Sequence, residues 1–167
     1  MKRRIEIIKS TQQPFMTTTT KNRLIAELSE SKVKVAEAEK AIGDAGGTSD
    51  WHDNFALDQA FLIFDKTMNR KFFLEAAIQQ AIIIEPRQEV DIIKMGNSAL
   101  VQYEGVSEPE TFTILGEQDA FTKDDWISFL SPLGSDLIGK KEGDIVTFKI
   151  KDRENKLTII EVLPGNF

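Results

Sequence analysis

The chain has 167 residues, with 21 lysines and arginines, 27 aspartates and glutamates, one histidine and no cysteine, for a formal net charge of −6. This length accommodates one ordinary domain or two small ones. A content of 41% apolar and 29% charged residues excludes a disordered or fibrous chain. The excess of acids excludes general binding to the phosphate backbone of nucleic acid. Without cysteine there are no disulfides or thiolate metal sites, and we expect a cytoplasmic protein.

Residues 1–20 are predicted to be an irregular N-terminal extension. The basic residues Lys2, Arg3 and Arg4 precede an apolar patch that Glu6 interrupts, and this patch is too short for a secretory signal. No stretch approaches the ~18–20 continuous apolar residues of a membrane helix, so no membrane association is expected. The threonine run at 17–20 is predicted to be a loop that leads into the first helix.

The first predicted helix covers residues 21–42, which contain neither glycine nor proline. Its inward positions recur at steps of four and three residues, which is the period of a coiled-coil seam. This seam consists of Leu24, Leu28, Ser31, Val35, Ala38 and Ile42. The glycine-rich segment over residues 43–49 then predicts a turn.

A second stretch without glycine or proline, residues 50–85, predicts another long helix. The same steps connect Leu57, Phe61, Phe64, Met68 and Phe72, and the phenylalanines at 55, 61, 64, 72 and 73 are all expected to be buried. At ~1.5 Å per residue this helix would be about 50 Å long. Two such helices joined by a short turn lie antiparallel, so residues 21–85 are predicted to form a coiled-coil hairpin with its tip at 43–53.

After Pro86 the pattern changes to short segments rich in β-branched and aromatic residues, which are typical of strands. Strands are predicted within residues 89–95, where the alternation is only partial, and over 99–103, 111–115, 145–150 and 157–163. Residues 131–141 predict one short helix, because Pro132 suits a first helical turn and Gly139 a C-terminal cap. Residues 86–167 are therefore predicted to form a small domain with a mostly antiparallel sheet, and the chain as a whole is α+β.

The charge divides along the same boundary. Residues 1–85 hold 12 basic and 12 acidic residues, whereas residues 86–167 hold 9 basic and 15 acidic ones. The whole excess of −6 therefore belongs to the second domain.

The motifs of a self-contained enzyme are missing from the sequence. His52 is the only histidine, and there is no nucleophile elbow, no glycine-rich nucleotide loop and no His or Cys cluster for zinc. The chain is therefore not expected to be an enzyme in its own right.

Two carboxylates at the predicted tip could bind a metal ion. Asp50 and Asp53 stand three residues apart, so on a helical turn they share one face. They form an incomplete site for a hard cation such as Mg²⁺, able to complete the shell of an ion that another molecule already holds. Helix capping by Ser49 or Asp50 and the preference for acids in a first helical turn explain the same residues structurally. Spacing alone does not decide between these readings.

The second half carries a long motif that resembles the bacterial Gre transcript-cleavage factors of RNA polymerase. Its most specific part is Ile127-Ser128 followed by Ser131-Pro132-Leu133-Gly134 and Leu137-Ile138-Gly139-Lys140-Lys141-Glu142-Gly143-Asp144, together with Gly96-Asn97-Ser98 and Phe112-Thr113-Ile114-Leu115-Gly116. The resemblance extends from about Leu24 to Leu163. It implies an FKBP-like fold for the second domain and a projecting coiled coil for the first half.

The resemblance also implies a function as a transcription elongation factor. Where the family's tip carries Gly-Asp-x-x-Glu-Asn, this sequence has Ser49-Asp50-Trp51-His52-Asp53-Asn54. Asp50 and Asp53 then take the place of two acids that enter the polymerase's secondary channel. There they help to bind the second Mg²⁺ of its active site and orient a water, so that the polymerase itself hydrolyses backtracked RNA.

The same resemblance assigns the remaining roles. Support of the tip is expected from Ser49, Trp51, His52 and Asn54, and contact with the polymerase from Ser131, Pro132, Leu133, Gly139, Lys140 and Lys141. The Mg²⁺ is shared with the polymerase and is not held stably by this chain alone. The expected partners are RNA polymerase and the 3′ end of the nascent RNA inside it, and the protein is expected to be a monomer.

Departures from the family pattern leave one alternative function open, and the FKBP-like fold suggests another. The second acid is Asp53 and not Glu, which shortens the side chain by one methylene, and a displacement on the order of 1 Å weakens catalysis substantially. Trp51 and His52 also differ from the usual pair between the acids. The alternative is therefore a regulator of the same fold that occupies the secondary channel without stimulating cleavage. A prolyl isomerase or chaperone is the third hypothesis, although a fold alone does not confer that activity.

Overall fold

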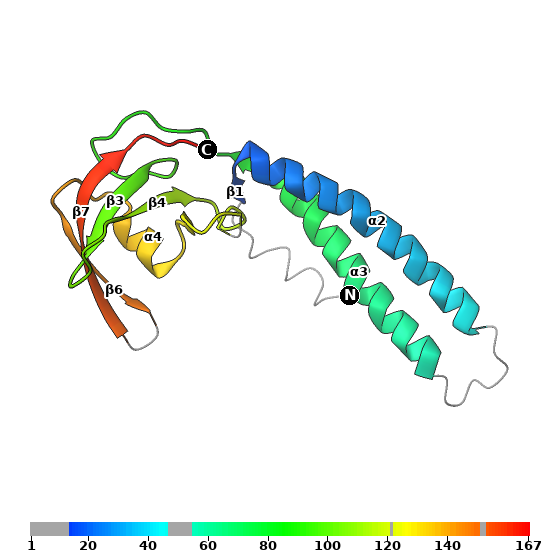
Figure 1. The fold of residues 1–167 in the computed structure, drawn as a ribbon. Coiled ribbons are helices and arrows are strands. Elements are labelled where there is room, and N and C mark those ends of the chain that lie inside the picture. The colour runs from blue at the N-terminus through cyan, green and yellow to red at the C-terminus, as the bar shows by residue number, and fades with distance from the viewer. Residues whose placement is uncertain (1–13, 47–54, 121, 151–152) are drawn as a thin grey trace. The chain divides into compact units, whose positions relative to one another are not determined.

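The computed structural model describes residues 14–46, 55–120, 122–150 and 153–167. The chain divides into two units, which we name the hairpin (residues 21–80) and the sheet unit (residues 81–167 with the N-terminal segment up to Thr20). The expected α+β class, with an antiparallel helical hairpin followed by a mainly antiparallel sheet, is confirmed (Figure 1). The division differs from the predicted one, because the segment before the hairpin belongs to the same unit as the chain after it.

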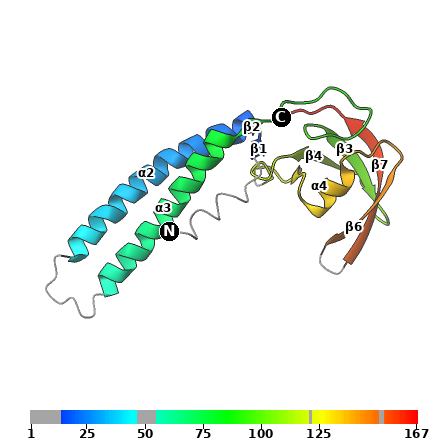
Figure 2. The same cartoon turned by 180° about the vertical axis from the view of Figure 1, so that it is seen from behind.

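The hairpin consists of α2 (Thr18–Gly46, 29 residues) and α3 (Phe55–Gln80, 26 residues), which lie side by side in both views (Figures 1 and 2). The threonines at 18–20 are helical, and not a loop as predicted. The helix also continues past Ile42 through Gly43 to Gly46. A glycine inside a helix costs about 1 kcal/mol. Here Ile42 and Ala45 extend the partly buried row to the end of the helix.

Burial on α2 follows the predicted seam. Four of its six positions are buried and the other two, Leu28 and Ile42, are half-buried. The seam on α3 agrees with the predicted one only in part. Leu57, Phe64 and Met68 are half-buried as predicted, whereas Phe61 and Phe72 are exposed, and the inward row is completed by Ala60, Thr67, Lys71, Leu74 and Ile78. Arg70 of α3 also reaches across to α2, where its Nη2 lies 2.5 Å from Oε1 of Glu27. This partly exposed ion pair connects the two helices beside the seam.

The phenylalanines of α3 do not form the predicted core. Only Phe64 is half-buried, whereas Phe55, Phe61, Phe72 and Phe73 are exposed. At two positions the predicted seam was one residue out of step, because Ala60 and Lys71 occupy the inward positions beside Phe61 and Phe72. The two rings therefore lie on the exposed side of the helix.

The second helix ends at Gln80, and not at Glu85 as predicted. Residues Ile82–Ile83 form a short strand, β2, which pairs in parallel with β1 (Phe15–Met16). The N–H of Ile82 donates to the carbonyl of Pro14, and the N–H of Ile84 donates to the carbonyl of Met16, both at 2.9 Å. These bonds replace the helical ones, and they explain why an apolar run without glycine or proline leaves the helix.

Asp119 ties the beginning of α2 to the loop after the strand over Glu110–Leu115. Its side chain is fully buried. Its Oδ1 accepts the Thr17 hydroxyl at 2.8 Å and the Thr17 N–H at 3.1 Å, and its Oδ2 accepts the N–H of Gly116 at 3.1 Å. The Thr17 hydroxyl in turn accepts the N–H of Thr20 at 3.2 Å, so Thr17 is the N-cap of α2.

Five strands form the main sheet in the order β5-β4-β3-β7-β6. They are β3 (Ser98–Tyr103), β4 (Glu110–Leu115), β5 (Trp126–Ser128), β6 (Ile145–Ile150) and β7 (Arg153–Leu163). All pairs are antiparallel except β4 with β5. Four of these strands were predicted, but β5 was not, because three residues are too few to show an alternating pattern.

Residues 89–95 do not form the predicted strand. The segment is held by the side chain of Asn97, which is fully buried and donates to the carbonyl of Glu89 at 2.8 Å. The backbone of Ile93 exchanges hydrogen bonds with Gly139 and Lys140, at 2.8 and 2.7 Å. An irregular segment with these partners satisfies its buried polar groups without a ladder.

The core of the sheet unit lies on one face of the sheet, where the helix α4 (Pro132–Leu137) packs against β5 and β6. Its buried members are Ile93, Ala99, Val101, Ile114, Leu137, Val146, Phe148, Leu157, Ile159 and Val162. A second cluster of Ile84, Leu115 and Trp126 packs with Phe15, Met95 and Phe167. The N-terminal strand therefore contributes to the core of this unit. None of the helices in the described ranges is long and apolar enough to cross a membrane.

Removal of the Asp119 carboxylate is expected to destabilise the protein strongly. Asp119→Ala leaves three buried donors without an acceptor, which costs about 2–4 kcal/mol of unfolding free energy. Urea unfolding followed by circular dichroism measures this loss. The matched control is Asp124→Ala, which removes an exposed carboxylate from the same loop region and should change the unfolding free energy by less than about 0.5 kcal/mol. Equal stability of the two variants would contradict the role given to Asp119.

Candidate functional site

The six residues predicted to form the tip lie outside the described residues. Ser49, Asp50, Trp51, His52, Asp53 and Asn54 all belong to the segment 47–54. Chain order places this segment between the last residue of α2 and the first residue of α3. The two predicted acids therefore belong to the connection between two helices of similar length.

Within the described ranges, no group of three or more His, Cys, Asp or Glu side chains is positioned to hold a metal ion. Exposed acids flank the tip segment on both helices, Asp44 near the end of α2 and Asp58 in the first turn of α3. These two residues are natural comparisons for any role given to Asp50 and Asp53.

The predicted polymerase-binding residues lie around α4. Ser131 is the N-cap of this helix, and its Oγ accepts the N–H of Gly134 at 3.0 Å and donates to the carbonyl of Ser128 at 2.7 Å. Pro132 occupies the first turn, as predicted. A Cβ at Gly134 would lie 2.0 Å from the carbonyl oxygen of Ser128, so only glycine fits there. The serine and glycine of this motif therefore have structural roles.

The end of the motif is also fixed by its backbone. Gly139 has a φ of +80°, and it follows the last helical residues as the predicted terminating glycine. Asp144 accepts the N–H of Lys141 at 3.0 Å through Oδ2 and closes the turn before β6. The chain thus holds Lys140 and Lys141 in a well-defined segment with both residues exposed.

Exposure separates the predicted contact residues into two groups. Ser131 and Leu133 are half-buried, whereas Pro132, Gly139, Lys140 and Lys141 are exposed. The structure adds two exposed apolar residues that the sequence prediction missed, Leu130 and Ile138. Only their exposure in the structure identifies them, because in the sequence each stands beside an apolar residue that packs inward. We name the exposed side chains Leu130, Pro132, Ile138, Lys140 and Lys141 the α4 surface.

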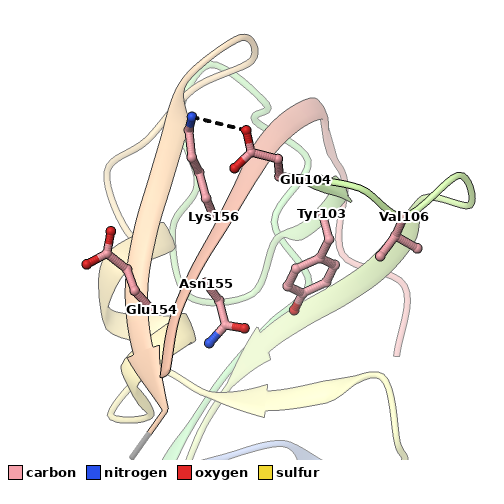
Figure 3. Close-up of a pocket in the computed structure, with 6 residues that line it drawn as sticks. All are labelled: Tyr103, Glu104, Val106, Glu154, Asn155 and Lys156. Carbon is pink, nitrogen blue, oxygen red and sulfur yellow. Dashed lines mark hydrogen bonds and ion pairs between the residues drawn. The ribbon is translucent and has the colours of Figure 1, made fainter. Parts of the chain in front are cut away.

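A groove of about 340 Å³ lies beside the ends of β3 and β7 (Figure 3). Its lining residues are Tyr103, Glu104, Val106, Glu154, Asn155 and Lys156. The Lys156 Nζ lies 3.5 Å from Oε1 of Glu104. None of these residues was predicted as a site residue, since the groove exists only where strands distant in sequence pair.

Burial raises the pKa of the Tyr103 phenol above its ordinary value of 10.0, and the negative charge of Glu110 raises it further. The ring is held edge-on against Phe148, with the ring centroids 6.3 Å apart. Tyr103 therefore remains a neutral hydrogen-bonding group at physiological pH.

Comparison with known proteins identifies the family. Residues 87–164 match the family model described as transcription elongation factor, GreA/GreB, C-term. Transcription elongation factor GreA of Thermoanaerobacter pseudethanolicus is 33% identical over 138 residues, which cover 82% of this chain and 82% of that protein. The chain belongs to the GreA/GreB family. A second GreA, from Roseiflexus sp., is 30% identical over 160 residues and covers 92% of this chain and 99% of that protein.

Solved structures of Gre-related proteins also match. Gfh1, the GreA factor homolog 1 of Thermus thermophilus, is 20% identical, with a TM-score of 0.43 and coverage of 90% of this chain and 99% of that one. The segment that matches the GreA/GreB C-terminal model, residues 87–164, contains the whole α4 surface. The hairpin, residues 21–80, precedes this segment in the chain.

The titration of Tyr103 tests the environment of the groove. Tyr103 is the only tyrosine in the chain, so the ultraviolet absorbance of phenolate reports on it alone. We expect the native protein to ionise at a higher pH than the urea-denatured chain, because folding favours the neutral phenol. The corresponding stabilisation is complete below the unfolded pKa and is lost as the pH rises through the folded pKa. Glu110→Gln should lower the native pKa, and coincident native and denatured titrations would contradict the assignment.

Proposed function

We propose that this member of the GreA/GreB family is a transcription elongation factor that binds RNA polymerase and stimulates Mg²⁺-dependent cleavage of backtracked RNA by the polymerase active site. In this proposal the hairpin enters the secondary channel and the acids Asp50 and Asp53 reach the catalytic centre. The observation that carries it is the presence of an Asp-x-x-Asp pair in the connection of a long helical hairpin, in a chain whose relatives are named elongation factors.

The length and width of the hairpin support the proposal that it carries the two acids to a site deep inside the polymerase. At ~1.5 Å per residue, α2 and α3 span about 43 and 39 Å. Two packed helices present a cross-section on the order of 20 Å, which suits a channel. The seam and the Glu27–Arg70 ion pair join the two helices along this length. A stiff support of this kind positions reactive groups at its end better than a loop does.

The chemistry requires a second molecule. Mg²⁺ prefers octahedral oxygen coordination, and two carboxylates supply only part of that shell. If the polymerase and the RNA already hold the second metal ion in part, the two carboxylates would complete its shell and make its binding more favourable. Such an ion activates water and stabilises the leaving oxygen. The chain then acts as a source of ligands and not as an enzyme. Lys32, Lys34 and Lys40 are exposed on α2 and offer positive charge for RNA contact, and Lys34 also lies 4.0 Å from Oε2 of Glu30.

Attachment to the polymerase is assigned to the α4 surface. Its exposed apolar side chains Leu130, Pro132 and Ile138 are flanked by Lys140 and Lys141, in a domain that is otherwise acidic. An apolar centre with a charged rim is typical of protein–protein contacts. The hydrogen bonds of Ser131 and Asp144 hold this segment before it binds, which reduces the entropy lost on association.

Loss of either acid is expected to abolish cleavage without abolishing binding. A backtracked polymerase complex incubated with the protein and Mg²⁺ should release short 3′ RNA fragments. Asp50→Asn and Asp53→Asn should each reduce the cleavage rate by on the order of 100-fold or more, because a neutral amide is a poor Mg²⁺ ligand. The matched control is Asp44→Asn, which changes an exposed acid near the end of α2 and should cleave at the normal rate.

The outcomes of this assay separate the two functions considered. Normal cleavage by both tip variants would refute the carboxylate assignment. No cleavage by the unchanged protein at saturating concentration would favour the alternative, a channel-occupying regulator without cleavage activity. The shorter side chain of Asp53 is the observation that favours that alternative.

An acidic substitution in the α4 surface is expected to weaken polymerase binding. Leu130→Asp places an unpaired charge in the proposed contact and should raise the dissociation constant by on the order of 10-fold or more. Ile160→Asp makes the same change at an exposed position on β7 and should leave the constant unchanged. Binding measured with fluorescently labelled polymerase distinguishes them. Equal affinities for the two variants would show that the α4 surface is not the contact.

A further inference from the structure

The main sheet has an open strand position beside the beginning of β7. β3 pairs with β7 only as far as Tyr103 opposite Leu157, whereas β6 follows β7 to its first residue, Arg153. The chain leaves β3 in a turn, in which the N–H of Val106 donates to the carbonyl of Tyr103 at 3.2 Å. Among the described strands, residues 153–155 of β7 therefore have a partner on one side only.

The backbone of Glu154 points into this open position. The N–H of Glu104 donates to the carbonyl of Lys156 at 3.0 Å, so the backbone polar groups of Lys156 face the β3 side. These groups alternate between the two neighbours of an antiparallel strand. Those of Glu154 therefore face the β3 side as well, and those of Asn155 face β6, where its partner is Phe148. One N–H and one carbonyl of Glu154 are thus offered to a further strand.

The groove of about 340 Å³ described above occupies the open position (Figure 3). Side chains alternate between the two faces of a sheet, which places Glu154 and Lys156 on one face and Asn155 on the other. A groove lined from both faces lies in the plane of the sheet, where a strand would continue. Its volume is at the lower end of the range for ligand sites, so it suits a short extended segment better than a folded partner.

The groove is acidic and also contains neutral hydrogen-bonding groups. Two carboxylates and one ammonium group belong to the lining, and the ammonium group of Lys156 is already paired with Glu104 at 3.5 Å. The carboxylate of Glu154 is exposed beyond this pair. The phenol of Tyr103 and the amide of Asn155 can both bind peptide groups. The matching ligand is therefore an extended peptide with positive charge.

The residues before Pro14 have this composition. They lie outside the described residues, and their sequence contains four basic residues and one acidic residue. Three of the basic residues are consecutive, at positions 2–4. The sheet unit carries the acidic excess of the chain, so the two parts are complementary in charge.

This segment is long enough to reach the groove. Its last residues are held beside Gly116, because a Cβ there would lie 1.7 Å from the carbonyl oxygen of Phe15. The register of β3 with β4 places Tyr103 eight residues from Gly116 along the sheet, which is roughly 27 Å. Thirteen extended residues span about 45 Å. About five residues therefore remain to lie in the groove.

We propose that the basic N-terminal segment of this chain, residues 2–5, occupies the groove as a short additional strand beside β7. Its backbone pairs with that of Glu154, and one of the arginines at positions 3 and 4 binds the Glu154 carboxylate through a charge-assisted hydrogen bond. The contact lies within the sheet unit and leaves the hairpin free. It does not depend on the function proposed above, and its tests need no polymerase.

Removal of residues 2–12 is expected to expose the Glu154 amide. In the full chain this amide should exchange its hydrogen on the order of 10-fold more slowly than in the shortened chain, because pairing protects it. The Asn155 amide faces β6 and should exchange equally in both, which makes it a control in the same molecule. Phe15 and Thr17 remain, so the core keeps its N-terminal partners. Equal exchange of Glu154 in the two chains, measured by NMR, would overturn the proposal.

Disulfide formation tests the location of the segment in the full-length chain. The protein has no cysteine, so pairs can be introduced without background. Ile5→Cys with Val106→Cys should close an intramolecular disulfide on the order of 10-fold faster than Ile5→Cys with Val90→Cys in the same glutathione buffer. Val106 and Val90 are similarly exposed, at 49% and 45%. Val90 follows Glu89, whose carbonyl is bound by Asn97 at the end of the sheet where the segment starts, so an unbound segment would reach it at least as easily.

Reversal of one charge tests the ion pair in the same assay. Glu154→Lys should slow the closure with Val106→Cys by on the order of 10-fold, because it replaces an attraction by a repulsion. The matched control is Glu161→Lys, which changes an exposed carboxylate on β7 outside the groove and should leave the rate unchanged. Equal rates for the Val106 and Val90 pairs, or equal effects of the two charge reversals, would show that the segment does not occupy the groove.

Discussion

The buried carboxylate of Asp119 is the interaction on which the sheet unit depends most. It accepts hydrogen bonds from Gly116, three residues before it, and from Thr17, 102 residues before it. Thr17 is also the N-cap of α2. An isolated buried charge would be costly, but three donors satisfy this one. The same carboxylate therefore holds the N-terminal segment in the core and defines where the first long helix begins.

The hairpin follows a simpler physical rule. Its two helices are joined by a seam of mostly small and medium side chains and by one ion pair between Glu27 and Arg70. The inward positions of α3 include Ala60, Thr67 and Lys71, so the neighbouring Phe61 and Phe72 lie on the exposed side of the helix.

Sequence patterning predicted the elements that repeat and missed those that depend on distant contacts. The α2 seam, four strands and the turn at Gly139 were found, because periodicity and turn chemistry are local. The α3 seam was predicted correctly at Leu57, Phe64 and Met68, but Phe61 was chosen in place of Ala60, since Phe61 is more apolar and only the partner helix decides between them. No local pattern predicts the strands β1 and β2, the groove at Tyr103 or the role of Asp119, because each involves residues far apart in sequence. Around α4, the start of the helix at Pro132 and the glycine that terminates it, Gly139, were predicted, but the exposed Leu130 and Ile138 required knowledge of burial.

The division of the chain has a consequence for its biosynthesis. The sheet unit is discontinuous, and the hairpin is inserted between its β1 and β2 strands. During synthesis the N-terminal strand emerges first, but Ile82 and Asp119, which hold it, emerge much later. The hairpin has mainly local contacts and can form in the interval. A fragment that starts at Pro86, although it contains the whole segment matched by the family model, would lack Phe15 and Thr17 and leave the buried carboxylate without its main donors.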